Sequence, residues 1–174
     1  MTASKFEILE TTIADIHAAF QAGTLTARQL VEMYFERIDA YDRNGPAINS
    51  LISLNPRALD EADRLDAALK NSGFVGPLHG IPYAAKDLFD VAGEVTGAGT
   101  RLLAGNVAAN DASVVRRLHD AGMVLVGKTH TVQFAFGGVG INHDTGTPRN
   151  PWRDDEPYVP GGSSSGSAVA VAAG

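Results

Sequence analysis

Two short apolar runs, each bounded by glycine, most limit the folds open to this chain. They cover residues 80–85 (Gly-Ile-Pro-Tyr-Ala-Ala) and 123–127 (Met-Val-Leu-Val-Gly). Such runs are typical of strands buried on both faces of a sheet. Between them, Asp111 is a suitable N-cap for a helix that Gly122 ends. Strand, helix and strand in this order indicate an α/β fold, with a parallel or mixed sheet covered by helices. The inward-facing residues predicted for the helix are Val114, Val115 and Leu118.

The preceding part of the chain is predicted to be mainly helical and to wrap outside that sheet. Thr12 caps a helix over residues 13–22, and Thr26 with Gln29 forms a capping box that opens a second helix. The second helix ends at the Asn-Gly-Pro turn of residues 44–46. A strand over residues 48–54 follows, and then a third helix with Pro56 in its first position. The predicted buried faces of the second and third helices comprise Leu30, Tyr34, Ile38 and Tyr41, and Leu59, Ala62, Leu65 and Leu69.

Composition excludes several classes of function. The chain has 174 residues, no cysteine, and a formal net charge of −6 from 14 basic and 20 acidic side chains. Disulfides, thiolate metal sites and a cysteine nucleophile are therefore excluded, and no basic cluster predicts nucleic-acid binding. No apolar run has the length of a signal sequence or a bilayer span. We therefore expect a single cytoplasmic domain without metal or cofactor and without membrane contact.

Lys86 follows directly on the first apolar run, at the end of a predicted buried strand. One interpretation is structural: the aliphatic stem packs while the ammonium reaches water or pairs with Asp87 or Asp90. The other is catalytic. A lysine with an ordinary pKa of about 10.4 acts as a base near neutral pH only if burial lowers that pKa, since deprotonation otherwise costs roughly 4 kcal/mol. Both interpretations stay open at this point.

The second chemical feature is a glycine-serine loop over residues 161–167 (Gly-Gly-Ser-Ser-Ser-Gly-Ser) that runs into Ala-Val-Ala-Val-Ala-Ala. A helix starting there directs several unpaired N–H groups at one place, which suits an anion or oxyanion. A flexible linker is the alternative, but a linker does not continue into a segment that needs burial. A phosphate-binding P-loop lacks its lysine here, and a nucleophile elbow at Ser164 lacks a following histidine.

A third segment, residues 145–152, is rich in turns and predicts an ordered loop with a partly buried Trp152. Together with the other two, it carries a family resemblance. The motifs Gly80-Ile-Pro with Lys86-Asp87, Gly127-Lys-Thr129, Pro148-Arg-Asn-Pro-Trp152 and Gly161-Gly-Ser-Ser-Ser-Gly166 occur in the order and with approximately the spacing of the amidase-signature family. The chain resembles that family over nearly its whole length.

The resemblance implies a serine-serine-lysine site that cleaves amides on an α/β/α fold with a mixed central sheet. In that site Lys86 matches the lysine base, and Ser163 matches a bridging serine that follows a cis peptide bond. Gly161, Gly162 and Ser164 match substrate-binding positions, and Ala135 matches a position of the acyl pocket, for which core packing is the alternative. No cofactor or metal is implied, and the expected substrate is a small-molecule amide.

The resemblance also implies that the acylating serine lies in a second glycine-serine motif further along than Gly174. We therefore expect residues 1–174 to be the amino-terminal part of one amidase domain, with residues 1–72 as a mainly helical outer region and residues 73–174 as the start of the catalytic core. Alone, this part is expected to be inactive and to associate with a second copy or a complementary carboxy-terminal chain. The alternatives to a hydrolase are an A-type amidotransferase component that works with partner chains, or a catalytically silent interaction fragment.

Overall fold

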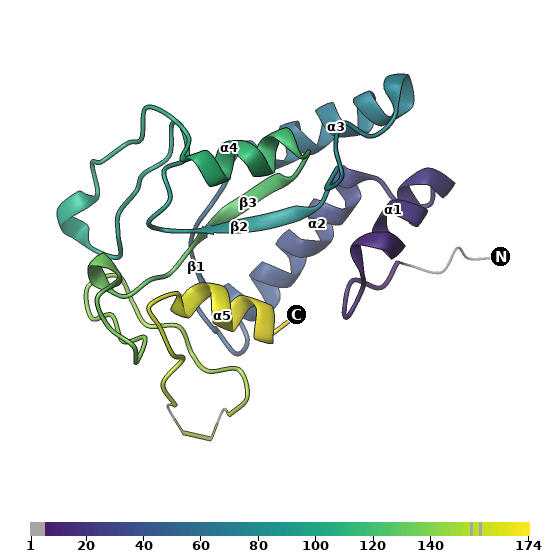
Figure 1. The fold of residues 1–174 in the computed structure, drawn as a ribbon. Helices are drawn as coiled ribbons and strands as arrows, with labels where there is room; N and C mark the ends of the chain where they lie inside the picture. The colour runs from purple at the N-terminus through teal and green to yellow at the C-terminus, as the bar shows by residue number, and fades with distance from the viewer. Residues whose placement is uncertain (1–5, 154, 157) are drawn as a thin grey trace.

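A three-stranded mixed sheet forms the centre of the molecule (Figure 1). The structure, a computed structural model, describes residues 6–153, 155–156 and 158–174. The strands are β1 (Leu51–Leu54), β2 (Pro82–Lys86) and β3 (Val124–Thr129), in the order β1-β3-β2. β1 is antiparallel to β3, and β2 is parallel to it. The two apolar runs therefore form neighbouring strands of one sheet, as predicted.

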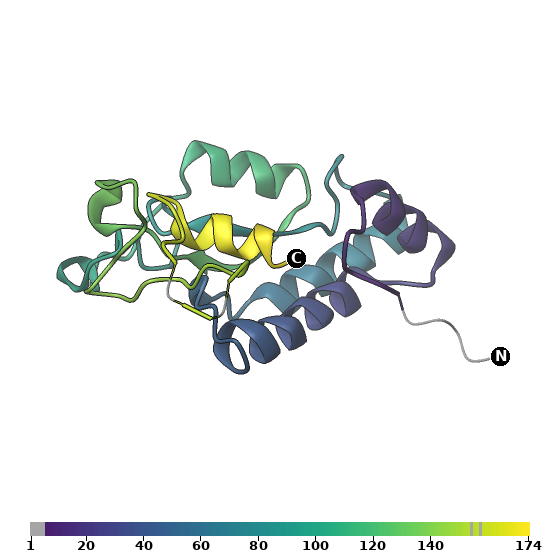
Figure 2. The same cartoon turned by 90° about the horizontal axis from the view of Figure 1, so that it is seen from below.

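Helices cover the sheet on both faces. The α-helices are α1 (Ile13–Ala22), α2 (Ala27–Arg37), α3 (Ala58–Ser72), α4 (Ser113–Asp120) and α5 (Ser165–Ala172). A π-helical turn η1 (Ile38–Arg43) extends α2, and two 3₁₀ turns, η2 (Arg101–Leu103) and η3 (Gln133–Ala135), lie in loops. Figure 2 shows α4 on one side of the sheet and α2 with α3 on the other. Within the described residues, none of these helices is both long and apolar enough to cross a bilayer.

The alternation of side chains along β3 explains the two layers. Val124 and Val126 point into a core formed with residues of α1, α2 and α3, whereas Leu125 points into a smaller core with Val115 of α4. All six residues of β3 are buried, as expected for a central strand. The chain therefore has the predicted α/β/α arrangement.

The predicted helix starts in the amino-terminal part are confirmed. Thr12 and Thr26 each cap their helix in a capping box, with Asp15 and Gln29 as the respective partners. Gly23 ends α1 in the left-handed conformation, at φ 69°. Local hydrogen bonding between side chain and backbone fixed these boundaries, so the sequence was sufficient to predict them.

Five predictions about these helices and strands were wrong. Asp111 is not the cap of α4, which begins at Ser113; its carboxylate instead accepts a hydrogen bond from the Ala92 N–H at 2.7 Å. Val114 is exposed because the short helix presents only one apolar face, around Val115. Tyr41 is exposed because the change to π-helix at residue 38 rotates later side chains off the face of Leu30.

The other two errors concern the segment between α2 and α3. The predicted strand over residues 48–54 is shorter, since β1 covers only Leu51–Leu54, and α3 begins at Ala58 rather than at Pro56. Asn55 lies between β1 and α3. Its Oδ1 accepts a hydrogen bond from the Arg57 N–H at 2.9 Å, and its Nδ2 donates one to the Leu125 carbonyl at 2.8 Å. Asn55 is thus tied to the sheet, which delays the start of α3.

Candidate active site

Lys86 is the last residue of β2 and lies beside Thr129 of β3. Its Nζ donates a hydrogen bond to the hydroxyl of Ser163 at 2.8 Å, although the two residues are 77 positions apart. Burial lowers the pKa of Lys86 below its ordinary value of 10.5. Within the described residues, no carboxylate forms an ion pair with Lys86, so the pairing with Asp87 or Asp90 considered above does not occur there. The lysine is thus held in a partly desolvated place with a hydroxyl as its partner.

The backbone around Ser163 is held on the segment that follows β3. The Gly162–Ser163 peptide bond is cis, as the family resemblance implied. The Ser163 carbonyl accepts two hydrogen bonds, from the Val132 N–H at 3.1 Å and from the Thr131 hydroxyl at 3.0 Å. These two bonds hold the main chain of Ser163 on the segment after β3, and its hydroxyl meets Lys86.

Gly161 and Gly162 allow close contact between two loops. Gly161 has φ 77°, and a Cβ on Gly162 would stand 3.0 Å from the backbone of Gly140. A Cβ on Gly140, which has φ 87°, would overlap the Gly161 carbonyl oxygen. Only glycines permit this backbone-to-backbone packing, which sets the approach of the serine loop to the sheet.

The serine run ends in a helix and not in a linker, since α5 begins at Ser165. Ser164 occupies the N-cap position of α5, but its side chain makes no capping hydrogen bond. Ser165 is fully buried and its hydroxyl has no partner among the described residues. Ser167 shares a hydrogen bond of 2.8 Å with the hydroxyl of Thr129, which joins α5 to the end of β3.

Ala135 lies in η3, with φ 55°, and is partly buried. It has no direct contact with Lys86 or Ser163 among the described hydrogen bonds. It is linked to them through Val132, whose carbonyl accepts from the Ala135 N–H at 2.8 Å and whose N–H donates to Ser163. Ala135 is therefore connected to Ser163 only through the main chain of Val132.

Two further residues at the site were missed by sequence reasoning. Lys128 in β3 is 2% exposed, and its Nζ lies 3.5 Å from the carboxylate of Asp87. Lys128 was used only as part of a family motif, and Asp87 only as part of another motif and as a possible partner of Lys86. The signal was available: Lys128 directly follows a run predicted to be buried on both faces, where a lysine needs a specific partner.

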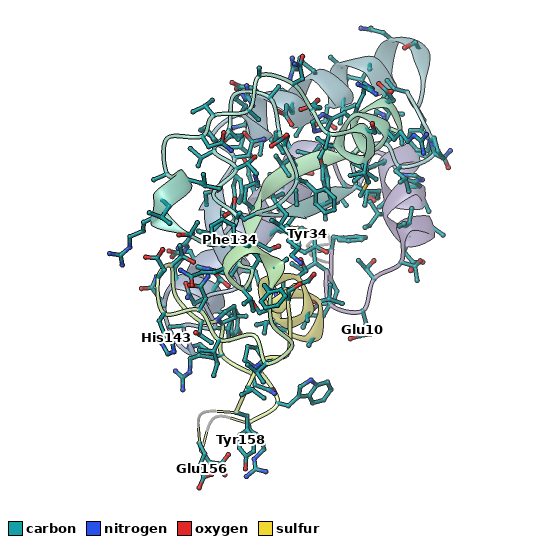
Figure 3. The ribbon with its side chains drawn as sticks, turned by 60° about the vertical axis from the view of Figure 1, so that its left-hand side comes forward. Glu10, Tyr34, Phe134, His143, Glu156 and Tyr158 are labelled. Atoms are coloured by element: carbon teal, nitrogen blue, oxygen red, sulfur yellow. The ribbon has the colours of Figure 1, made fainter. Side chains whose placement is uncertain are left out.

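The third predicted segment differs from expectation. Trp152 is 78% exposed and not partly buried. Its backbone N–H donates to Asn150 Oδ1 at 3.0 Å, so the turn is ordered by backbone contacts without burial of the indole. Figure 3 shows Glu156 and Tyr158 of the same loop extending away from the body of the molecule, whereas Tyr34 lies within it.

Comparison with known proteins places the chain among amidases. The family model described as Amidase matches residues 29–174. The A-type subunit of glutamyl-tRNA(Gln) amidotransferase from Halorhodospira halophila is 44% identical over 163 residues, which are 93% of this chain and 32% of that protein. The chain thus spans about a third of the length of the curated relatives it matches.

Solved structures agree with this assignment. The native peptide amidase of Stenotrophomonas maltophilia is 44% identical, with a TM-score of 0.87, over 95% of this chain and 34% of that one. An amidase family protein of Bacillus anthracis is 32% identical, with a TM-score of 0.86 and the same coverages. The family match over most of its length and the shared fold mean that the chain belongs to the amidase-signature family.

Proposed function

We propose that this chain carries the lysine base and the bridging serine of an amidase that hydrolyses a carboxylic amide to an acid and ammonia or an amine. The observation that carries the proposal is the hydrogen bond of 2.8 Å between Lys86 Nζ and Ser163 Oγ. A lysine whose partner is a hydroxyl and not a carboxylate has no charged partner that holds it in the protonated state.

In the proposed mechanism, Lys86 enters as the neutral amine. It takes the proton of the Ser163 hydroxyl while Ser163 takes the proton of a nucleophilic hydroxyl, which attacks the amide carbonyl. The same relay returns a proton to the departing nitrogen, and water then hydrolyses the acyl-enzyme by the reverse route. Partial burial supports this role of Lys86, because it makes the ammonium form less favourable than it is for a lysine fully exposed to water.

By family resemblance the nucleophile is a second serine outside residues 1–174. We propose that Gly161, Gly162 and Ser164 help to bind the substrate, and that Ala135 borders its acyl group. What supports this is position: the first three adjoin Ser163 in the loop before α5, and Ala135 is joined to Ser163 through Val132. We also propose that the active protein works in the cytoplasm, bound to a second copy or to a partner chain.

An amidotransferase subunit is a second candidate, favoured by the 44% identity to the A-type subunit of a glutamyl-tRNA(Gln) amidotransferase. The two candidates use the same lysine and serine but differ in the fate of the nitrogen. A hydrolase releases it without any partner, whereas an amidotransferase passes it to an acceptor held by partner chains. The peptide amidase is equally similar at 44% identity and supports the hydrolase, so identity alone does not separate the two candidates and the fate of the nitrogen has to be measured.

The test is amide turnover by the longest gene product that contains this chain, on a panel of aryl amides, aliphatic amides and peptide amides. Lys86→Ala is expected to abolish release of ammonia or amine without loss of fold, as judged by circular dichroism. Lys70→Ala is the matched control, because Lys70 is exposed at the end of α3. Full activity of Lys86→Ala would refute the role of Lys86. Nitrogen release that requires added partner chains would favour the amidotransferase.

A further inference from the structure

Lys128 and Asp87 form a buried ion pair next to the proposed active site. The Lys128 ammonium donates to the carbonyls of Phe89 at 2.9 Å and Val95 at 3.0 Å, and lies 3.5 Å from Asp87 Oδ1. Both side chains are almost fully inaccessible to solvent, at 2% and 3% exposed. Charges buried this deeply are costly unless each has a charged or hydrogen-bonding partner, so the arrangement is specific.

Asp87 has its own set of donors and directly follows Lys86 in the chain. Its two carboxylate oxygens accept from the N–H groups of Gly97 at 3.0 Å and Gly99 at 3.2 Å. Its backbone N–H donates to the Thr129 carbonyl at 3.1 Å, which continues the pairing of β2 with β3 past Lys86. Asp87 thus anchors the glycine-rich loop at residues 97–99 to the end of the lysine strand.

The pair also fixes the turn that leaves the active-site strand. The Lys86 carbonyl accepts from the N–H groups of Leu88 at 2.7 Å and Phe89 at 2.9 Å. The carbonyl of Phe89 is in turn held by Lys128. On the far side, the Ala98 carbonyl accepts from the Phe134 N–H at 2.8 Å, in the segment that contains Ala135. One buried ammonium therefore ties together the base strand and the loop that supports the proposed acyl pocket.

The negative charge of Asp87, besides its hydrogen bonds, bears on the protonation of the two lysines near it. Burial lowers the pKa of Lys128 below its ordinary value, and the carboxylates of Asp87, Asp90 and Glu94 oppose this effect only in part. On Lys86, by contrast, burial is the cause of the lowered pKa. An uncompensated carboxylate close in space to the base would favour the ammonium form and raise the pKa of that base. The pairing with Lys128 places a compensating positive charge 3.5 Å from the Asp87 carboxylate.

We infer that Lys128 and Asp87 are positioning residues of the amidase site, which hold the Lys86 strand and its following turn in place and keep the neighbouring carboxylate from acting on the base. The inference rests on the proposed function of Lys86. It concerns residues that touch neither substrate nor reacting atoms, and act through Lys86 and the loop around Ala98.

The test is the pKa of Lys86, measured by NMR of lysine ¹³Cε signals in the longest gene product that contains the chain. Lys86→Arg assigns the signal, and the exposed Lys70 serves as internal reference. In Lys128→Met, the unpaired carboxylate is expected to raise the Lys86 pKa by about one unit. In Asp87→Asn, the unpaired ammonium is expected to lower it by a similar amount. The double variant is expected to return it to the wild-type value.

Opposite shifts distinguish positioning from support of the fold alone. A general loosening would admit water to Lys86 and raise its pKa in both single variants. Shifts of the same sign, or no shift in folded variants, would overturn the inference. If one single variant does not fold, the inference is decided by the other single variant together with the double variant. The double variant leaves no uncompensated charge. Because the pKa is measured without turnover, a failure here is separate from a failure of the proposed amidase activity.

Discussion

Gly166 in the first turn of α5 packs directly on His130 in the segment after β3. The Gly166 N–H donates to the His130 carbonyl at 3.0 Å, and the His130 N–H donates to the Ser50 carbonyl at 2.9 Å. A Cβ on Gly166 would overlap both the Ser50 carbonyl oxygen and the His130 nitrogen. The serine loop therefore reaches the sheet through a contact between main chains, and that contact sets where Ser163 stands.

Gly166→Ala is expected to lower the free energy of unfolding by at least about 1 kcal/mol, because main-chain atoms on two sides cannot move aside for the methyl group. This expected net loss already allows for the gain in helix propensity, which is about 1 kcal/mol at most. Urea unfolding measures the change. Gly105→Ala is the control, since a Cβ there meets open space. Equal stabilities of the two variants would contradict the packing described.

Asp42→Ala is expected to destabilise the chain by roughly 2–4 kcal/mol, since buried donors lose their acceptor. Asp42 is 3% exposed, and its carboxylate accepts from the N–H and the hydroxyl of Ser50, both at 2.5 Å. Thermal or urea unfolding gives the measurement, with Asp60→Ala on the exposed face of α3 as the control. A loss no larger than that of the control would mean that the η1 turn is not held by this carboxylate.

If the proposed amide hydrolysis is correct, the activity of the longest gene product that contains this chain is expected to rise with pH through the pKa of Lys86 and to level off above it, because the neutral amine is the active form. Burial lowers this pKa, so the midpoint is expected below 10.5. Profiles of kcat/KM against pH provide the measurement. Lys86→Arg is expected to be inactive at every pH, since a guanidinium does not deprotonate. Recovery of activity by the arginine variant at high pH would exclude a general base at this position.

The stability of the chain is expected to fall as pH decreases from about 7, because His79 resists protonation in the folded state. His79 is fully buried and stacks on Phe74, and burial, followed by repulsion from His17, lowers its pKa below 6.5. The unfolded chain then binds more protons than the folded one between that lowered pKa and 6.5. The loss amounts to at most about 1.4 kcal/mol per pH unit for one group.

His79→Gln is expected to flatten this dependence, measured as urea midpoints between pH 7 and pH 5. His143→Gln is the control, because His143 lies exposed on the surface (Figure 3). His130, whose pKa burial also lowers, acts in the same direction and accounts for the slope that remains. If the pH dependence of stability is unchanged in His79→Gln but is lost in His143→Gln, the dependence does not come from His79.

Local sequence determined the helix starts at Thr12 and Thr26, because each capping box closes within four residues. It also determined β2 and β3, since apolar runs of this length require burial wherever the chain places them. The family motifs then singled out Lys86 and Ser163, and the structure brings these two side chains within 2.8 Å.

Only the tertiary structure decided which partner each charged or polar residue takes. Asp111 and Asp87 offered plausible local partners, yet Asp111 binds the Ala92 N–H and Asp87 pairs with Lys128. Likewise, nothing in the order of residues indicates that Trp152 is exposed or that Gly166 meets His130. Short-range hydrogen bonds and apolar periodicity are encoded by neighbours in sequence, whereas the partner of a buried charge depends on which strands lie side by side. That long-range choice leaves Lys86 with a hydroxyl and without a carboxylate partner among the described residues.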